Sequence, residues 1–265
     1  MDAYARERVA LRTADELARI GEACLVVHDV LDELERAAVP GVTTAELDRL
    51  ARARTRERGA GPAFLGYHSF PAAVCISVND EVVHGIPSPD RVLRDGDIVG
   101  LDFGAALAGW YGDAARTVLV GRVGEEAAQL VVATRAALEA GIRAAVPDGR
   151  LGDIGAAVQG VVEAKGYSVV RDFVGHGIGR RLHEPPQVPN FGARGTGGRL
   201  RAGMVLAIEP MVNAGGFEVE TTEDGWTAVT LDGSLSAHFE HTVAVTEEGP
   251  VVLTSRHEGR GGQVR

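Results

Sequence analysis

The chain has 265 residues, which is enough for one large or two ordinary domains with a sizeable buried core. Its 45% apolar and 24% charged residues are typical of a globular protein, and its net charge of −10 disfavours nucleic-acid recognition, which needs concentrated Lys and Arg. No segment approaches the roughly 20 apolar residues that cross a bilayer, none has the pattern of a signal peptide, and only two cysteines are present. We therefore expect a cytoplasmic protein with reduced thiols and no membrane contact.

Two helices are predicted near the N-terminus. Thr13 with Glu16 forms the capping-box pattern of a helix start, and Thr43 with Glu46 repeats it. The second helix is expected to end near Gly59. After the first cap, apolar residues recur at steps of three and four, which predicts one buried helical face. The residues of this face are Leu17, Ile20, Cys24, Val27, Leu31 and Leu34.

Apolar segments bounded by Gly, Pro and Asp predict strands farther along the chain. The first two strands are expected over residues 74–79 and 97–103. The segment 108–112 suits a turn between antiparallel strands. Two more strands are expected over residues 204–208 and 237–245, and in the latter successive side chains would point to opposite faces.

The second half of the chain repeats the plan of the first. Residues 37–40, Ala-Ala-Val-Pro, recur as residues 144–147, a shift of 107 positions. The same shift superposes two glycines that follow helices, and it carries Asp102, at the end of one apolar strand, onto Glu209, at the end of another. The sequence therefore predicts an α+β fold made of a pseudo-two-fold pair of helix-helix-strand halves.

Four acidic residues and one histidine stand where such halves would meet. Asp102 follows an apolar strand, and Asp113 comes eleven residues later, across the predicted turn. Glu209 ends the repeated strand, and Glu240 lies inside the alternating strand. His176 lies among glycines, which let the backbone approach a neighbouring group closely. If the halves close around a shared centre, these side chains converge.

Convergence of four carboxylates requires positive charge. Buried like charges repel, and the one nearby cation, Arg116, cannot balance them. Two divalent ions would balance them, and oxygen ligands with a single imidazole suit Mn, Fe, Co or Zn. A metal pair can share and activate a water, which favours metal-assisted hydrolysis. The alternative for any single acid is a strand end that faces water.

Short motifs along most of the chain resemble those of the methionine aminopeptidases, within the pita-bread metallopeptidase family. The resembling runs are residues 75–87, 102–113, 175–179, 182–186, 208–211 and 240–242. The resemblance implies a pita-bread fold, in which helices pack outside a curved antiparallel sheet. We expect this single catalytic domain over residues 1–256 and a flexible C-terminal tail over residues 257–265.

The resemblance also implies a role for each ligand. Asp102 would chelate one of two divalent ions (Co, Mn, Fe or Zn), and His176 with Glu209 would bind the other. Asp113 and Glu240 would bridge both ions. In this family a metal-bridging hydroxide attacks the first peptide bond, and the residue that matches Glu209 shuttles the proton.

Two further histidines and an apolar pocket complete the implied site. His183 would donate a hydrogen bond to the scissile carbonyl, and His84 would contact the substrate and support the departing amide. The methionine side chain would fill a pocket, which a thioether suits because it packs well against aromatic rings. The pocket residues are Phe64, Tyr67, Phe70, Cys75, Leu182 and Trp226.

The chain departs from the family pattern at three positions. Phe64 stands where relatives often have Cys, Leu182 where they often have Phe, and Gly104 where a polar residue is more usual. These changes leave the metal ligands intact. Four further histidines are expected to be structural, with a place in the pocket left open for one of them, His68; the other three are His28, His238 and His241.

The motifs resemble most closely the bacterial type I enzymes, whose task is to remove the initiator methionine when the second residue is small. This implies a peptide or nascent-chain N-terminus as partner and a monomer, and leaves ribosome association open. One rival is a peptidase of the same fold that cleaves before proline. Another is a binding module of this fold that has lost catalysis, although all five ligand positions are filled here.

Overall fold

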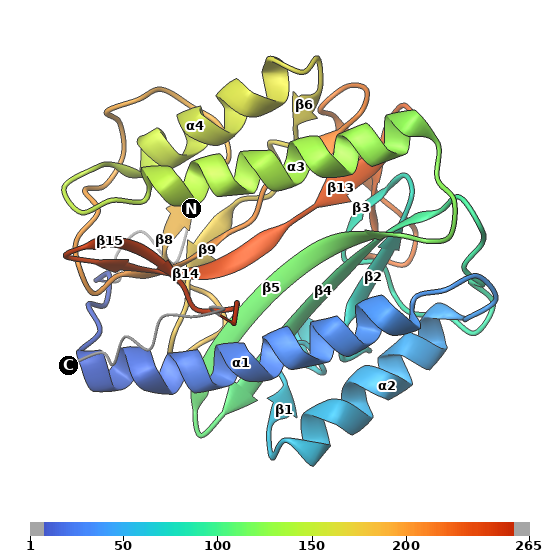
Figure 1. Cartoon of the computed structure of the whole chain (residues 1–265), viewed down its shortest axis with the longest axis horizontal. Helices are drawn as coiled ribbons and strands as arrows, with labels where there is room; N and C mark the ends of the chain where they lie inside the picture. The colour runs from blue at the N-terminus through green and yellow to red at the C-terminus, as the bar shows by residue number, and fades with distance from the viewer. Residues whose placement is uncertain (1–7, 257–265) are drawn as a thin grey trace.

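Four helices flank one side of a long curved sheet in the computed structural model, which describes residues 8–256 (Figure 1). In Figure 1 one helix pair lies below the long strands β5 and β14 and the other pair lies above them. Among residues 8–256 no helix is long and apolar enough to cross a bilayer. The helices are α1 (Ala14–Ala37), α2 (Thr44–Glu57), α3 (Glu125–Ala144) and α4 (Leu151–Glu163).

The strands between and after the helices are mostly short, and β4 and β5 are the longest. A 3₁₀ turn, Tyr67–Ser69, precedes β2. The strands are β1 (Gly61–Pro62), β2 (Cys75–Val78), β3 (Glu81–Val83), β4 (Ile98–Leu107), β5 (Trp110–Leu119), β6 (Ser168–Val169), β7 (Gly175–Gly177), β8 (Glu184–Val188), β9 (Val205–Ile208), β10 (Met211–Asn213), β11 (Val219–Thr221), β12 (Ala228–Thr230), β13 (Ser236–His238), β14 (Glu240–Thr246) and β15 (Gly249–Val252).

Both predicted capping boxes form at the starts of α1 and α2. The Thr13 hydroxyl accepts the Glu16 N–H at 3.3 Å, and the Thr13 N–H donates to the Glu16 carboxylate at 3.0 Å. Thr43 and Glu46 make the same pair of bonds at the start of α2. The N–H groups at a helix start otherwise lack partners, so these local bonds fix where each helix begins. Helix α2 ends two residues before Gly59, whose φ of +69° suits a helix terminus.

The main sheet is antiparallel, with the strand order β1-β4-β5-β14-β9-β7-β8, and with β2 added to β4 and β15 added to β14. The central part of this order, β4-β5-β14-β9, is symmetric about the β5–β14 pair. The 107-residue shift relates β4 to β9, and it carries Thr44, the start of α2, onto Leu151, the start of α4. The two repeated halves therefore meet between β5 and β14.

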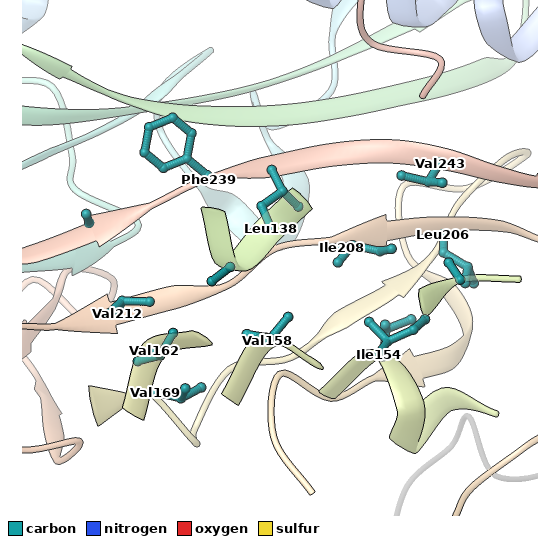
Figure 2. Packing of buried hydrophobic residues seen from close by; sticks show 14 of the residues in the cluster. Leu138, Ile154, Val158, Val162, Val169, Leu206, Ile208, Val212, Phe239 and Val243 are labelled. Atoms are coloured by element: carbon teal, nitrogen blue, oxygen red, sulfur yellow. The ribbon is translucent and has the colours of Figure 1, made fainter. Parts of the chain in front are cut away.

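Each helix pair buries an apolar face against the sheet. Beneath α3 and α4, Leu138, Ile154 and Val158 pack against Leu206 and Ile208 of β9 (Figure 2). A second cluster fills the matching space beneath α1 and α2; it includes Val27, Leu31, Leu34, Leu47, Leu101 and Phe103. Val27, Leu31 and Leu34 of the predicted α1 face belong to this cluster, whereas Leu17, Ile20 and Cys24 pack in a third cluster. The sheet is therefore held from one side by both helix pairs, and its other side is available for a site.

The strands differ from the predicted ones in two places. The first lies between β4 and β5, where a two-residue turn at Ala108 and Gly109 has positive φ at both positions, as tight hairpins require. The strand expected over 97–103 therefore continues to Leu107. The strand expected over 237–245 breaks at Phe239, because β13 pairs with β10 whereas β14 pairs with β5 and β9. The expected tail, residues 257–265, lies outside the described residues.

Candidate metal centre

Five neighbouring strands deliver the five predicted ligands to one place. Asp102 lies on β4, Asp113 on β5 and Glu240 at the start of β14. Glu209 directly follows β9, and His176 is the middle residue of β7. These strands are consecutive in the sheet, so residues far apart in the sequence become lateral neighbours.

One cavity of about 440 Å³ collects every residue that the sequence assigned to ligation, catalysis or substrate contact. A cavity of this size is ordinary for a small-molecule or peptide-end site. Its lining includes Asp102, Asp113, His176, Glu209, Glu240, His84, His183, Phe64, Tyr67, Phe70, Cys75, Leu182 and Trp226. The structure therefore brings all of the predicted site residues together.

The ligand atoms are close and lack partners. One atom from each of Asp113, His176 and Glu240 lies within 4.8 Å of the others, and Nε2 of His176 is 3.5 Å from Oε1 of Glu209. Within residues 8–256, Oδ1 of Asp102, Oδ1 of Asp113 and Oε1 of Glu240 are buried without a hydrogen-bond partner. A buried acceptor without a donor costs free energy, and a metal ion would satisfy all three. The donor set therefore fits divalent cations.

The carboxylates disfavour one another's ionisation when no cation is bound. Burial raises the pKa of Asp102 to about 7. Burial and the Asp102 charge raise the pKa of Asp113. Burial raises the pKa of both Glu209 and Glu240, and the neighbouring acids raise both further. A raised pKa favours the protonated carboxyl, and a divalent ion would displace that proton.

His176 is arranged to offer a lone pair to the centre. Its Nδ1 lies 2.9 Å from the Gly177 carbonyl, which can only accept, so Nδ1 carries the proton and Nε2 is free of one. Burial, and secondarily the neighbouring His183, lower the pKa of His176 to about 3. The imidazole is therefore neutral at physiological pH, the form that binds metals.

His183 and His84 lie at the edge of the centre. The His183 ring is 4.2 Å from that of His176, and its Nδ1 is 2.7 Å from the Tyr67 hydroxyl. Burial, then the neighbouring His84 and His68, lower the pKa of His183 to about 4. His84 has a positive φ of 61°, which is unfavourable for a residue with a side chain and is often found at functional sites.

Two of the departures from the family pattern, Gly104 and Phe64, fit together in space. A side chain on residue 104 would place its Cβ 2.8 Å from the Phe64 ring and 3.3 Å from Oδ1 of Asp113. The Phe64 ring thus occupies space that a side chain at Gly104 would need. The third departure, Leu182, is buried in the same apolar cluster as Phe64. Three of the other predicted pocket residues, Tyr67, Phe70 and Trp226, are aromatic, and the rings of Phe70 and Trp226 are in edge contact with centroids 5.2 Å apart.

The sequence assigned no site role to some residues that line the cavity. His238, expected to be structural, lines it with Nε2 3.9 Å from Oε2 of Glu209. Its position two residues before Glu240 was the available signal. Val83, Phe173 and Met211 also line it, and their apolar character gave no signal that separates them from core.

The other histidines have the places that the sequence favoured or left open. His68 lines the cavity. His241 is outside the cavity lining, and its Nδ1 lies 2.9 Å from the Thr254 hydroxyl. His28 lies on α1, 3.5 Å from Asp32. The sequence left open whether His68 lines the pocket, and its position at the cavity shows that it does.

Known proteins match this chain over most of its length. A family model described as metallopeptidase family M24 matches residues 18–247. The chain is 50% identical to a methionine aminopeptidase of Clostridium acetobutylicum over 246 residues, which cover 93% of this chain and 98% of that protein. A crystal structure of methionine aminopeptidase from Thermotoga maritima superposes with a TM-score of 0.93 at 46% identity, and covers 94% of this chain and 100% of that one.

A prolidase from Pyrococcus furiosus superposes with a TM-score of 0.76 at 23% identity, over 94% of this chain and 66% of that one, and so shares the fold alone. The pita-bread architecture expected from the motifs is confirmed by these superpositions. The match to the family model begins within α1 and runs past the end of β14, and on this basis the chain belongs to metallopeptidase family M24.

Proposed function

We propose that this protein removes the initiator methionine from peptides and nascent proteins whose second residue is small. One observation carries the proposal: unpaired buried carboxylates and a neutral imidazole lie beside an aromatic pocket in a single cavity. The relatives named methionine aminopeptidase support it. We also propose a monomeric cytoplasmic enzyme with one catalytic domain over residues 1–256.

Five side chains would hold two divalent ions of Co, Mn, Fe or Zn. Asp102 would bind one ion, His176 and Glu209 the other, and Asp113 and Glu240 both. When bound, such a pair lowers the pKa of a water and polarises a carbonyl. The short distance between His176 and Glu209 supports their assignment to the same ion.

The protein's own groups would then handle the proton and the peptide. Glu209 would take a proton from the attacking water and pass it to the departing amide nitrogen. His183, oriented by the Tyr67 hydroxyl, would donate to the scissile carbonyl oxygen as negative charge develops. His84 would contact the peptide beyond that bond.

The cavity lining divides into two apolar groups, which suits the two residues that flank the cleaved bond. One group contains Phe70, Cys75 and Trp226, and we assign it to the methionine side chain. The other contains Phe173 and Met211 and belongs to a separate packing cluster, and we assign it to the second residue.

Peptide selectivity tests this function. Met-Ala-Ser is expected to be cleaved, whereas Met-Leu-Ser is expected to be cleaved about 100-fold more slowly or worse, because the larger side chain does not fit beside the centre. An X-Pro dipeptide serves as the competing substrate. Faster cleavage of the X-Pro peptide, or equal rates for Ala and Leu, would contradict the assignment. A protein that binds metal and cleaves none of the three would be a binding module instead.

A further inference from the structure

The two central strands pair directly over only two residue pairs. Strand β14 aligns with β5 at Glu240–Ala115 and His241–Ala114. On both sides of this short ladder the same register continues, but a threonine hydroxyl lies between the two backbones. Thr242 of β14 faces Asp113 of β5 on one side. On the other side, Thr117 of β5 faces His238 of β13.

Each hydroxyl makes both bonds that a facing backbone would normally make. The Thr242 hydroxyl accepts the Asp113 N–H at 3.1 Å and donates to the Asp113 carbonyl at 2.7 Å. The Thr117 hydroxyl accepts the His238 N–H at 2.9 Å and donates to the His238 carbonyl at 2.9 Å. A hydroxyl can do this because it is both donor and acceptor, whereas in a regular antiparallel pair two residues exchange N–H and C=O bonds directly.

Two proposed ligands lie on the strands that these hydroxyls join. Asp113 and Glu240 lie on the two strands that the hydroxyls separate, and their carboxylates contribute to the close group with His176. One oxygen of each carboxylate has no hydrogen-bond partner within residues 8–256, so neighbouring side chains do not fix it. The separation of the two backbones therefore sets the distance between the ligands.

We propose that Thr117 and Thr242 are positioning residues, which hold β5 and β14 at the separation that the metal ions require. Both side chains are buried, with exposed fractions of 2% and 0%, so water cannot replace their bonds. Without the hydroxyl, the buried N–H and C=O groups of Asp113 and His238 would lose their partners, and the strands would shift and displace the carboxylates. The inference rests on the proposed function, because it takes Asp113 and Glu240 as metal ligands.

Replacing each threonine by valine removes the hydroxyl and keeps the shape of the side chain. Titration calorimetry of the metal-free protein with Mn²⁺ is expected to show affinity about 10- to 100-fold lower in Thr117→Val and in Thr242→Val, the range typical of groups that orient metal ligands. Thr117→Ser and Thr242→Ser keep the hydroxyl and are expected to bind as the wild type does. If a valine variant does not fold, the cysteine variant, with its weaker donor and acceptor, is expected to show a smaller loss in the same direction.

Thr134→Val is the matched control. Thr134 is also fully buried, but its hydroxyl donates within helix α3 to the Leu130 carbonyl, so its loss is expected to leave Mn²⁺ affinity unchanged. Thermal unfolding of each metal-free variant separates general stability from ligand spacing. Valine variants that lose stability but bind Mn²⁺ like the wild type would overturn the proposal.

Different experimental results would contradict the proposed function and the proposed role of the threonines. A wild-type protein that binds Mn²⁺ tightly, with the expected losses in the valine variants but no cleavage of Met-Ala-Ser, would overturn the proposed function and support the role of the threonines. A wild-type protein that cleaves the peptide, with unaltered Mn²⁺ affinity in the valine variants, would overturn the role of the threonines alone. A wild-type protein that binds no divalent metal would overturn both.

Discussion

Replacing Glu209 by glutamine is expected to lower kcat for Met-Ala-Ser by about 10³-fold or more, and replacing it by alanine to abolish turnover. Glutamine keeps the shape and one oxygen donor but cannot accept and release a proton. Alanine also removes the ligand that lies 3.5 Å from His176. The glutamate is held in place from its backbone as well, since Asn190 donates to its carbonyl at 3.1 Å. Steady-state kinetics with metal analysis of each variant measures both effects.

A carboxylate outside the cavity provides the control. Glu220 is exposed on β11, so Glu220→Gln changes net charge equally but is expected to leave kcat and metal content unaltered. If Glu209→Gln kept most of the wild-type kcat at full metal occupancy, the proton would be carried by another group. If the Glu209→Gln variant bound less metal but its metal-loaded fraction kept the wild-type kcat, Glu209 would be a metal ligand only.

The parts of the fold that the sequence predicted are those set by local chemistry or by repetition. The capping boxes at Thr13 and Thr43 depend on residues three apart, so the sequence contains all the information they need. The 107-residue repeat then placed Asp102 and Glu209 at equivalent strand ends. Convergence of the acids followed from the symmetry of the halves.

The features that the sequence could not predict depend on contacts between distant segments. The break at Phe239 arises because the chain leaves one sheet for another. Side chains alternate in the same way before and after such a change, so the sequence pattern does not reveal it. The exclusion of a side chain at Gly104 by Phe64 is visible only when the two segments are adjacent. Likewise, Thr117 and Thr242 have no distinguishing sequence pattern, because their hydroxyls act between strands.

Metal removal is expected to make the protein both inactive and increasingly unstable as the pH rises from about 6.5 to 8. The pKa values of Asp113, Glu209 and Glu240 are raised well above those of ordinary carboxyls, and that of Asp102 to about 7. A group with a raised folded-state pKa contributes stability that is fully present at low pH and is lost as the pH rises through that pKa. Bound cations would hold the acids ionised at every pH in this window. The difference in Tm between Mn²⁺-loaded and chelator-treated protein should therefore widen with pH.

The lower limit of the window is set by histidines whose pKa values are lowered by burial, which act in the opposite direction. The stability of the folded protein falls as the pH drops below about 6.5, because these histidines bind protons in the unfolded chain and not in the folded one. The histidines are His84, His176, His183, His238 and His241. Above that pH the acids dominate the slope, because the buried thiols of Cys24 and Cys75, whose pKa values burial also raises, ionise in the unfolded chain only toward pH 9. Asp102→Asn removes one titrating carboxyl and is expected to make the metal-free Tm less dependent on pH, as measured by calorimetry between pH 6.5 and 8. Parallel Tm curves for loaded and metal-free protein would mean that the carboxylates are ionised without a cation, and the electrostatic reason for a metal pair would be removed.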